Sequence, residues 1–584
     1  MPWPSLHLGR VTAFLLSAAL LMTVRIAIAQ QPAPKWTASE TLAWEQIKRG
    51  EATDFSARCK QAAFDPLSDE QLVSQMDCRG LSAAFLHDIL TRLRSDIPIQ
   101  GIHIAGSRII GNVEMANLKL GSPIIVENSV FHGNIDLTLA RADSPLVIMN
   151  SRVDGLFDAH AFRSDSVLDL SGTNFKKDLH LQFAKIDGYL DLSDAILEQD
   201  LHADGLQLGA TLFLRTDKRK GAFKNVGLRS SRLANNLTMD GATFDGTIDM
   251  DATRAGQSVL FRGSTAKRII LKNAVIARDV NLIGSTLTGD EKEALTVEGR
   301  ALEVAGSLRM QDAVVHRSLG LTFIHVGGNV ELNGAKLGTL DLSGASISGE
   351  LRLRPGDRSS FHADEIALRT TRVGYLVSTD DAWPLKGHLH IDGFNFGHLG
   401  GVDVNSRTSS AHYRLAWWLD DWAERDDYTP GIYDQLAAAF SAAGRRDDAD
   451  EIRFRNRQRQ REEEWTHSKL AWFGDLLQEA VAGYGIKMFR VLIPVGLITV
   501  LGGLYLWKCV PTAHWKGLPW CCGATLSRLL PIIEINKEFA AFFDDPMRER
   551  LTPLQTAVFS AISLLGWILG GILIAAMASL TQRL

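Results

Sequence analysis

A short apolar pattern, in which two apolar side chains flank one variable residue, returns about every eleven residues along the middle of the chain. It occurs at residues 179–181, 190–192 and 212–214, and again from 308–310 to 351–353. Alternation puts both apolar side chains on one face of a short strand, and a fixed period of this kind is typical of stacked repeats. An eleven-residue helical repeat also exists, but glycine recurs in nearly every unit and costs a helix about 1 kcal/mol each time. The pattern therefore predicts a mainly β chain built as a solenoid.

Three segments carry a resemblance to a known family. Residues 190–197 (LDLSDAIL), 330–337 (VELNGAKL) and 340–347 (LDLSGASI) resemble the loose repeat of the pentapeptide-repeat family of right-handed β-solenoids. Coils in that family have about four short sides, which implies that two eleven-residue units make one turn here. We expect this domain to cover residues 98–404.

The pattern is interrupted at three places inside this domain. Residues 214–232, 252–275 and 285–300 lack the apolar alternation. Because a coil that follows the repeat should keep its alternation, we expect inserted loops at all three places.

The N-terminal residues read as a targeting segment. Arg10 precedes an apolar stretch at 11–24, and small residues follow at 27–29, which is the order of a secretory signal peptide over residues 1–29. Arg25 interrupts the end of the apolar stretch, so an uncleaved anchor is the alternative. Either reading places the repeat domain outside the cytoplasm.

Residues 30–97 favour a helical cap, which a solenoid needs to cover its open end. Cys59 and Cys78 are the cysteine pair of this exported region, and an oxidising compartment permits a disulfide between them. The pairing itself does not follow from the sequence.

The C-terminal part changes to helical and then to membrane character. Residues 405–485 indicate a helical domain, with a hairpin that turns at Gly444 and resembles a single TPR-like unit. Residues 486–584 contain two apolar stretches near the roughly 20 residues that a span requires. Lysines and arginines in the connecting loop, 509–553, favour a cytoplasmic loop, and therefore an extracytoplasmic solenoid on a bacterial inner membrane.

Two glycine pairs lie within the predicted spans. Gly502 and Gly503 lie in the first, and Gly570 and Gly571 in the second. Small residues let membrane helices approach closely, so these pairs offer a route to helix contact or to a homo-oligomer.

The tail also resembles a module of bacterial membrane proteins that carry pentapeptide-like repeats. The resemblance rests on GYGIKMFR before the first span, LLPIIEIN in the loop and LLGWILGGILIAAMASL in the second span. Some of those proteins are labelled membrane-associated oxidoreductases. The resemblance implies a shared membrane anchor, and no residue of this chain supports the redox label.

Two sets of variable residues fall in one register if two units make a turn. His180 and His202 should stack about 5 Å apart, in line with Glu114 and Asp136, and such a histidine pair is suited to binding a metal or sensing pH. The favoured alternative is a row of solvated side chains, because no third ligand stands at ligand spacing.

Arg309, Glu331 and Arg352 should stack in the same way. One interpretation is a contact stripe for an anion or a glycan. The favoured interpretation is structural, since opposite charges on neighbouring strands stabilise a sheet by about 0.2–1 kcal/mol per pair.

The sequence therefore predicts a non-enzymatic, membrane-anchored envelope scaffold whose solenoid binds an envelope protein or polymer. A Walker loop and the HExxH and GxSxG motifs are missing, so we assign no catalytic residue, metal or cofactor. A net charge of -5 gives no reason to expect nucleic-acid binding. The alternatives are a component of an oligomeric channel or transport assembly, and an envelope enzyme.

Overall fold

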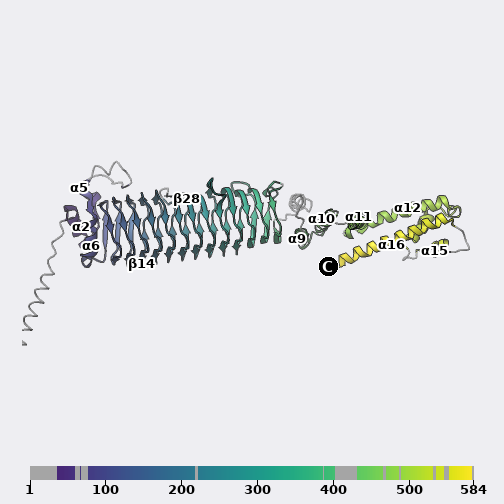
Figure 1. Ribbon diagram of the computed structural model, residues 1–584, viewed down its shortest axis with the longest axis horizontal. Helices are drawn as coiled ribbons and strands as arrows, with labels where there is room; N and C mark the ends of the chain where they lie inside the picture. The colour runs from purple at the N-terminus through teal and green to yellow at the C-terminus, as the bar shows by residue number, and fades with distance from the viewer. Residues whose placement is uncertain are drawn as a thin grey trace, which may run out of the picture. The chain divides into compact units, whose positions relative to one another are not determined.

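The computed structural model contains a parallel β-solenoid of about 13 turns, an N-terminal helix, C-terminal helices and two candidate apolar spans (Figure 1). The chain divides into two compact units, residues 1–249 and 250–584. The structure describes residues 36–59, 66, 76–217, 221–385, 387–400, 430–464, 469–485, 488–530, 535–544 and 551–581. The predicted signal peptide lies outside the described residues.

The first unit begins with a cap. Its helices are α2 (Ala38–Lys48), α3 (Phe55–Arg58), α5 (Met76–Arg79) and α6 (Ala83–Thr91). Thr37 and Glu40 form a capping box at the start of α2, and Glu40 also accepts hydrogen bonds from the backbone and hydroxyl of Ser82. The helix is thereby fastened to the start of α6.

The cap also contributes two short strands, β1 (Thr53–Asp54) and β2 (Gly80–Ser82). They pair in parallel with β3 (Ile102–Ala105) and β4 (Arg108–Ile110), the first strands of the two solenoid sheets. Because an uncovered edge strand invites pairing with other chains, these strands and helices close the end of the stack. The predicted helical cap is thus extended by strands.

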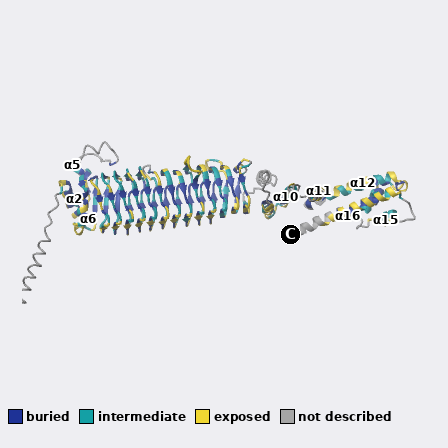
Figure 2. Ribbon diagram, viewed as in Figure 1, coloured by how far each residue is buried: buried dark blue, intermediate teal, exposed yellow. Residues whose placement is uncertain are grey.

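Apolar ladders form the core of the first unit. In one sheet, Leu146, Leu168, Leu190 and Leu212 pair across β11 (Leu146–Met149), β15 (Leu168–Asp169), β19 (Leu190–Asp191) and β23 (Leu212–Phe213). Each leucine is at most 1% exposed, and burying one contributes about 1.5–3 kcal/mol. Figure 2 shows the same buried interior along the strands. The eleven-residue pattern thus corresponds to half a coil.

Left-handed backbone marks the corners at the same spacing. Between residues 117 and 205 of the first unit, a positive φ recurs every eleven residues, at Asn117, Asn128, Leu139, Asn150, Ala161, Gly172, Phe183, Asp194 and Gly205. At Gly205 a Cβ atom would lie 2.7 Å from Cδ1 of the Phe183 ring, which covers this glycine from the preceding coil. Other residues adopt this φ at the equivalent corners, so it is chiefly the space that the ring occupies that requires glycine at this position.

A ladder of hydroxyl groups runs through the interior at another corner. Ser107, Ser129, Ser151 and Thr173 are fully buried. The hydroxyl of Ser129 accepts the backbone N–H of Ser107 at 3.0 Å, and the hydroxyl of Ser151 accepts that of Ser129 at 3.1 Å. The hydroxyls of Ser129, Ser151 and Thr173 thus each accept a backbone N–H of the preceding coil, which avoids an unpaired donor.

Two of the three predicted loops are present as longer coils. Partners in neighbouring coils are normally 22 residues apart. The separation rises to 25 residues at Asn225, within the break at 214–232, and to 28 residues at Ser307, after the break at 285–300. The third expectation is wrong, because β29 (Arg254–Ala255), β30 (Val259–Leu260) and β31 (Thr265–Ile270) continue the solenoid through residues 252–275.

The second unit continues with strands that are often longer. They include β37 (Leu308–Arg309), β40 (Val330–Glu331), β42 (Ser346–Leu353), β44 (Arg372–Ser378) and β46 (Asn395–Gly400), all paired in parallel within one sheet. Buried apolar residues such as Leu319, Leu340 and Ile366 fill the interior between the sheets. The same unit contains the C-terminal helices.

The helical part begins with a hairpin. It consists of α9 (Pro430–Ala442) and α10 (Arg446–Glu464), with Gly444 in the predicted turn at a φ of +78°. The following helices are α11 (Lys469–Ala482), α12 (Leu492–Cys509), α13 (Pro511–His514), α14 (Leu518–Leu529), α15 (Lys537–Asp544) and α16 (Pro553–Thr581).

Two of these helices are long and apolar enough to cross a membrane. The windows are Leu492–Cys509 and Pro553–Gly571, and only 17% and 22% of them are buried inside the protein. The core helix of a soluble protein would be mostly buried, whereas these helices expose leucine and isoleucine side chains such as Leu492, Ile493 and Leu564. Exposed apolar surface of this extent favours contact with lipid.

The segment between the two spans, predicted as a loop over residues 509–553, is partly buried against them through α14. A Cβ on Gly502 would lie 2.6 Å from Thr525 Cγ2, and one on Gly503 would lie 2.6 Å from Cys522 Sγ. On the other side, a Cβ on Gly566 of α16 would lie 1.8 Å from the Leu529 carbonyl oxygen. The absence of side chains at these glycines therefore lets α14 pack between parts of α12 and α16. Burial of the apolar residues of α14 makes this packing favourable.

Candidate contact stripes on the solenoid

The predicted histidine row is present in the first unit. Glu114, Asp136, Asp158, His180 and His202 occupy equivalent positions of β5 (Val113–Glu114), β9 (Ile135–Asp136), β13 (Phe157–Asp158), β17 (Leu179–His180) and β21 (Leu201–His202). Asp158 belongs to this row and was missed, although its place follows from the same 22-residue step.

The two histidine side chains lie against each other at the end of this row. Their ring centroids are 5.1 Å apart at an interplanar angle of 77°. Nδ1 of His180 lies 4.0 Å from Oδ2 of Asp158, and Nε2 of His202 lies 3.9 Å from Oδ1 of Asp178. Asp178 comes from the corner before β17, and its Oδ1 accepts the backbone N–H of Asp200 at 3.0 Å. One ligand atom from each of Asp178, His180 and His202 can be chosen so that all lie within 4.8 Å of one another.

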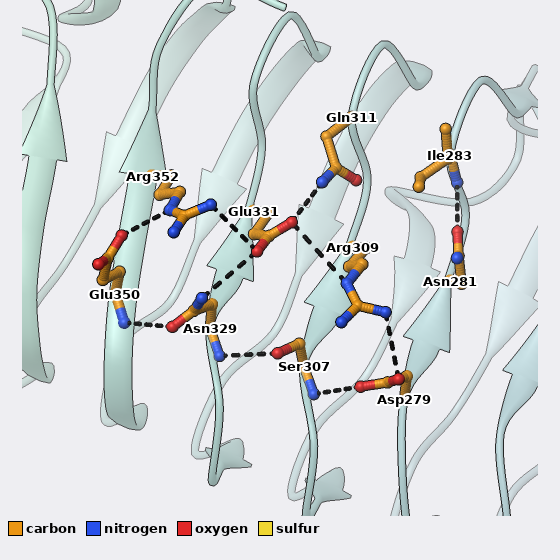
Figure 3. A network of polar contacts seen from close by, with 10 residues as sticks. All are labelled: Asp279, Asn281, Ile283, Ser307, Arg309, Gln311, Asn329, Glu331, Glu350 and Arg352. Carbon is orange, nitrogen blue, oxygen red and sulfur yellow. Dashed lines mark hydrogen bonds and ion pairs between the residues drawn. The ribbon is translucent and has the colours of Figure 1, made fainter.

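The predicted charged stripe of the second unit is also in register. Arg309, Glu331 and Arg352 occupy paired positions on β37, β40 and β42 (Figure 3). Glu331 is only 8% exposed. Its carboxylate lies 3.3 Å from Nη1 of Arg352 and 3.9 Å from Nε of Arg309, and it accepts a hydrogen bond from Gln311. The central carboxylate is thus shared between two guanidinium groups.

Further carboxylates complete this network. Asp279 lies 3.1 Å from Nη1 of Arg309, and Glu350 lies 2.5 Å from Nε of Arg352. The hydrogen bond from Arg352 to Glu350 raises the pKa of the Arg352 side chain. Since both arginines have carboxylate partners within the protein, the stripe works as an internal clamp, and little charge is left for an external anion.

Side chains at the adjoining corner form a second ladder in the same view. Asp279 accepts the backbone N–H of Ser307, Ser307 accepts that of Asn329, and Asn329 accepts that of Glu350 (Figure 3). Oxygen-bearing short side chains are favoured at corners for this reason. The corner and the clamp together fix the neighbouring coils in register.

A polar cluster that the sequence analysis missed lies in the first unit. His132 Nδ1 is 2.9 Å from Oδ2 of Asp154, and Nε2 of the same ring accepts a hydrogen bond from Arg108. The arginine can only donate, so Nε2 is the acceptor and the proton resides on Nδ1. Burial raises the pKa of Asp154, but hydrogen bonds from His132 and Arg152 outweigh it, and the pKa lies below its ordinary value.

An acidic pair faces outward on the other sheet of the first unit. Asp169 and Asp191 are direct partners on β15 and β19. Burial raises the pKa of Asp191, the hydrogen bond from Ser193 lowers it, and the charge of Asp169 raises it further. The net result is a pKa above the ordinary value.

An exposed row of cations was also missed. Lys119, Arg141, Arg163 and Lys185 are consecutive partners on neighbouring strands of one sheet of the first unit. Arg141 contacts Asp165 at 2.7 Å, and Lys119 contacts Asp143 at 2.8 Å. The 22-residue step that predicted the other rows also predicts this one. The row forms a regular line of charged side chains on the surface of the first unit.

The cysteines separate into the two groups that their positions suggested. Cys59 and Cys78 form a disulfide with a Cα–Cα distance of 6.1 Å. Among the free cysteines, Cys509 is exposed, Cys521 is buried and Cys522 is intermediate. Cys521 is buried because α14 packs against the spans, so its thiol is shielded from solvent although it lies between the two spans.

Comparison with protein-family models, with curated proteins and with solved structures gives no match. The repeat architecture therefore stands on the structure alone. The pentapeptide-repeat resemblance and the oxidoreductase label gain no support from these comparisons.

Proposed function

We propose that this chain is a non-enzymatic scaffold, anchored in the bacterial cytoplasmic membrane, whose solenoid binds another envelope protein or a polymer. One observation carries the proposal. The chain combines a solenoid, whose outward side chains are in register, with two helices that are long and apolar enough to cross a membrane. Stacked coils hold outward groups at a constant step of about 4.8 Å, which suits a partner that follows several coils.

Two features support an extracytoplasmic solenoid. The disulfide of the cap is typical of an oxidising compartment. At the end of α12 and in the segment after it, Lys508, Lys516 and Arg528 favour a cytoplasmic position for that side of the membrane. With two spans after the solenoid, the C-terminal end of α16 would lie on the same side of the membrane as the solenoid.

The channel alternative requires several copies, because two spans cannot line a pore. Gly502 and Gly503 pack against α14 of the same chain, so they are not free to contact a second copy. A Cβ added to Gly570 or Gly571 would have no heavy atom of the described chain within 4 Å, and this face remains for an oligomer contact.

Photocrosslinking in cells tests the scaffold proposal. A photoreactive residue is placed in the full chain at Arg141, Arg163 or Lys185, which form one row. Matched controls place it at Lys177 or Gln199, which are exposed, 22 residues apart and follow strands of the other sheet in the same coils. The proposal expects the same crosslinked product from successive rungs of one row and little from the other. Absence of a product from both rows, or products scattered without regard to the row, would contradict it.

A further inference from the structure

Asp178, His180 and His202 bring a carboxylate and two imidazoles together on the first unit. The three residues are half-buried, and their candidate ligand atoms lie within 4.8 Å of one another. The two histidines come from directly paired positions of adjacent coils, and Asp178 lies two residues before the first of them. The ladder of the parallel sheet therefore fixes the two histidines, and the hydrogen bond from the Asp200 N–H holds Asp178 beside them.

His202 and Asp178 are not within hydrogen-bond distance of each other, whereas three other histidines of the solenoid lie within that distance of a carboxylate. His132 lies 2.9 Å from Asp154, His103 lies 2.8 Å from Glu127 and His390 lies 2.9 Å from Glu365, all within hydrogen-bond distance. The corresponding separation for His202 and Asp178 is 3.9 Å. This distance is too long for a hydrogen bond.

We propose that Asp178, His180 and His202 bind a divalent transition-metal ion such as Zn²⁺. Metal–ligand bonds of about 2.0–2.1 Å place tetrahedral ligand atoms about 3.3 Å apart. The present separations exceed this value by an amount that small side-chain rotations remove. Imidazole ligands select zinc and its neighbours over Mg²⁺ and Ca²⁺, which prefer oxygen.

Surrounding groups complete the description of the site. The backbone N–H of Asp200 holds Oδ1 of Asp178 at 3.0 Å and so orients the carboxylate. Asp158 lies on the preceding coil, with Oδ2 4.0 Å from Nδ1 of His180, and would serve as a fourth ligand. A bound ion would thus join three successive coils.

The site can be weakened without disturbing the corner. Equivalent corner positions in other coils hold Asn134 and Asn225, whose Oδ1 atoms accept the same type of backbone hydrogen bond. Asp178→Asn should therefore keep the fold while removing the charge. His180→Gln and His202→Gln remove one imidazole each, and His160→Gln is a matched control because His160 is exposed in the same coils.

The test is a Zn²⁺ titration of the full chain in detergent. Binding is measured by calorimetry, and the bound metal is quantified after dialysis. The protein carries no polyhistidine tag, its free thiols are alkylated, and chelator-treated protein is used. Co²⁺ is the spectroscopic probe, since its visible absorption reports the ligand set. We expect one ion per chain, with affinity at least about tenfold lower in Asp178→Asn, His180→Gln and His202→Gln.

Two results would overturn the proposal. One is the absence of saturable Zn²⁺ or Co²⁺ binding by the wild-type chain. The other is binding that His180→Gln and His202→Gln leave as strong as His160→Gln does. Far-ultraviolet circular dichroism of each variant separates loss of the ligand from loss of the fold. Neither result bears on the scaffold proposal, which photocrosslinking tests separately.

Discussion

Glu331→Gln is expected to loosen the coils around β40 and β42. The substitution keeps the shape of the side chain but removes the charge that lies 3.3 Å from Arg352 and 3.9 Å from Arg309. Both arginines are about one-third exposed, so each pairing contributes about 0.2–1 kcal/mol. Both keep a second carboxylate, so neither charge is orphaned. We expect a local loss of about 1 kcal/mol, which accelerates amide exchange by about fivefold.

Hydrogen exchange measures this loss at named amides. The N–H of Met310 donates to the Glu331 carbonyl, and the N–H of Leu332 donates to the Arg352 carbonyl. These amides should exchange faster in Glu331→Gln, because stability in a stacked repeat is set by neighbouring units. Glu303→Gln is the control, since Glu303 is exposed in the same sheet. Unchanged exchange in Glu331→Gln, or an equal effect in the control, would refute the clamp.

Asp191→Asn should stabilise the first unit near neutral pH. The raised folded-state pKa means that the ionised form opposes folding, so this penalty grows as the pH rises above about 4. Thermal unfolding should show the gain at neutral pH and its loss in acid. Gly503→Leu should raise the reactivity of the Cys522 thiol by displacing α14, whereas Gly571→Leu, with open space around it, should not. Reducing the cap disulfide should lower the free energy of local opening of residues 83–91 by about 3 kcal/mol. Hydrogen exchange of their amides measures this loss.

The repeat allowed rows of side chains to be predicted because register is one-dimensional. A step of 22 residues places His180 on His202 and Arg309 on Glu331, and the structure contains both pairings. The step was applied only to residues already noticed, so Asp158 was missed. The same applies to the whole Lys119 row, which needed no further information.

Contacts between different rows required the corner geometry. Asp178 lies at the corner directly before β17, outside the strand ladder, and approaches His202 of the next coil from there. The contact of His132 with Arg108 likewise joins positions that alternation alone does not relate. In the tail, apolar composition predicted the spans, but the packing of α14 depends on where Gly503 and Gly566 allow backbone to approach.

Cysteine accessibility tests the central claim most directly. Intact spheroplasts are treated with a membrane-impermeant thiol reagent, with and without prior reduction. Cys509 is the informative cysteine between the spans, because it is exposed whereas Cys521 is buried. An exported solenoid predicts labelling of Cys59 and Cys78 only after reduction, with Cys509 protected until the membrane is opened. Labelling of Cys509 in intact spheroplasts, with the cap cysteines protected, would place the solenoid in the cytoplasm and contradict the account.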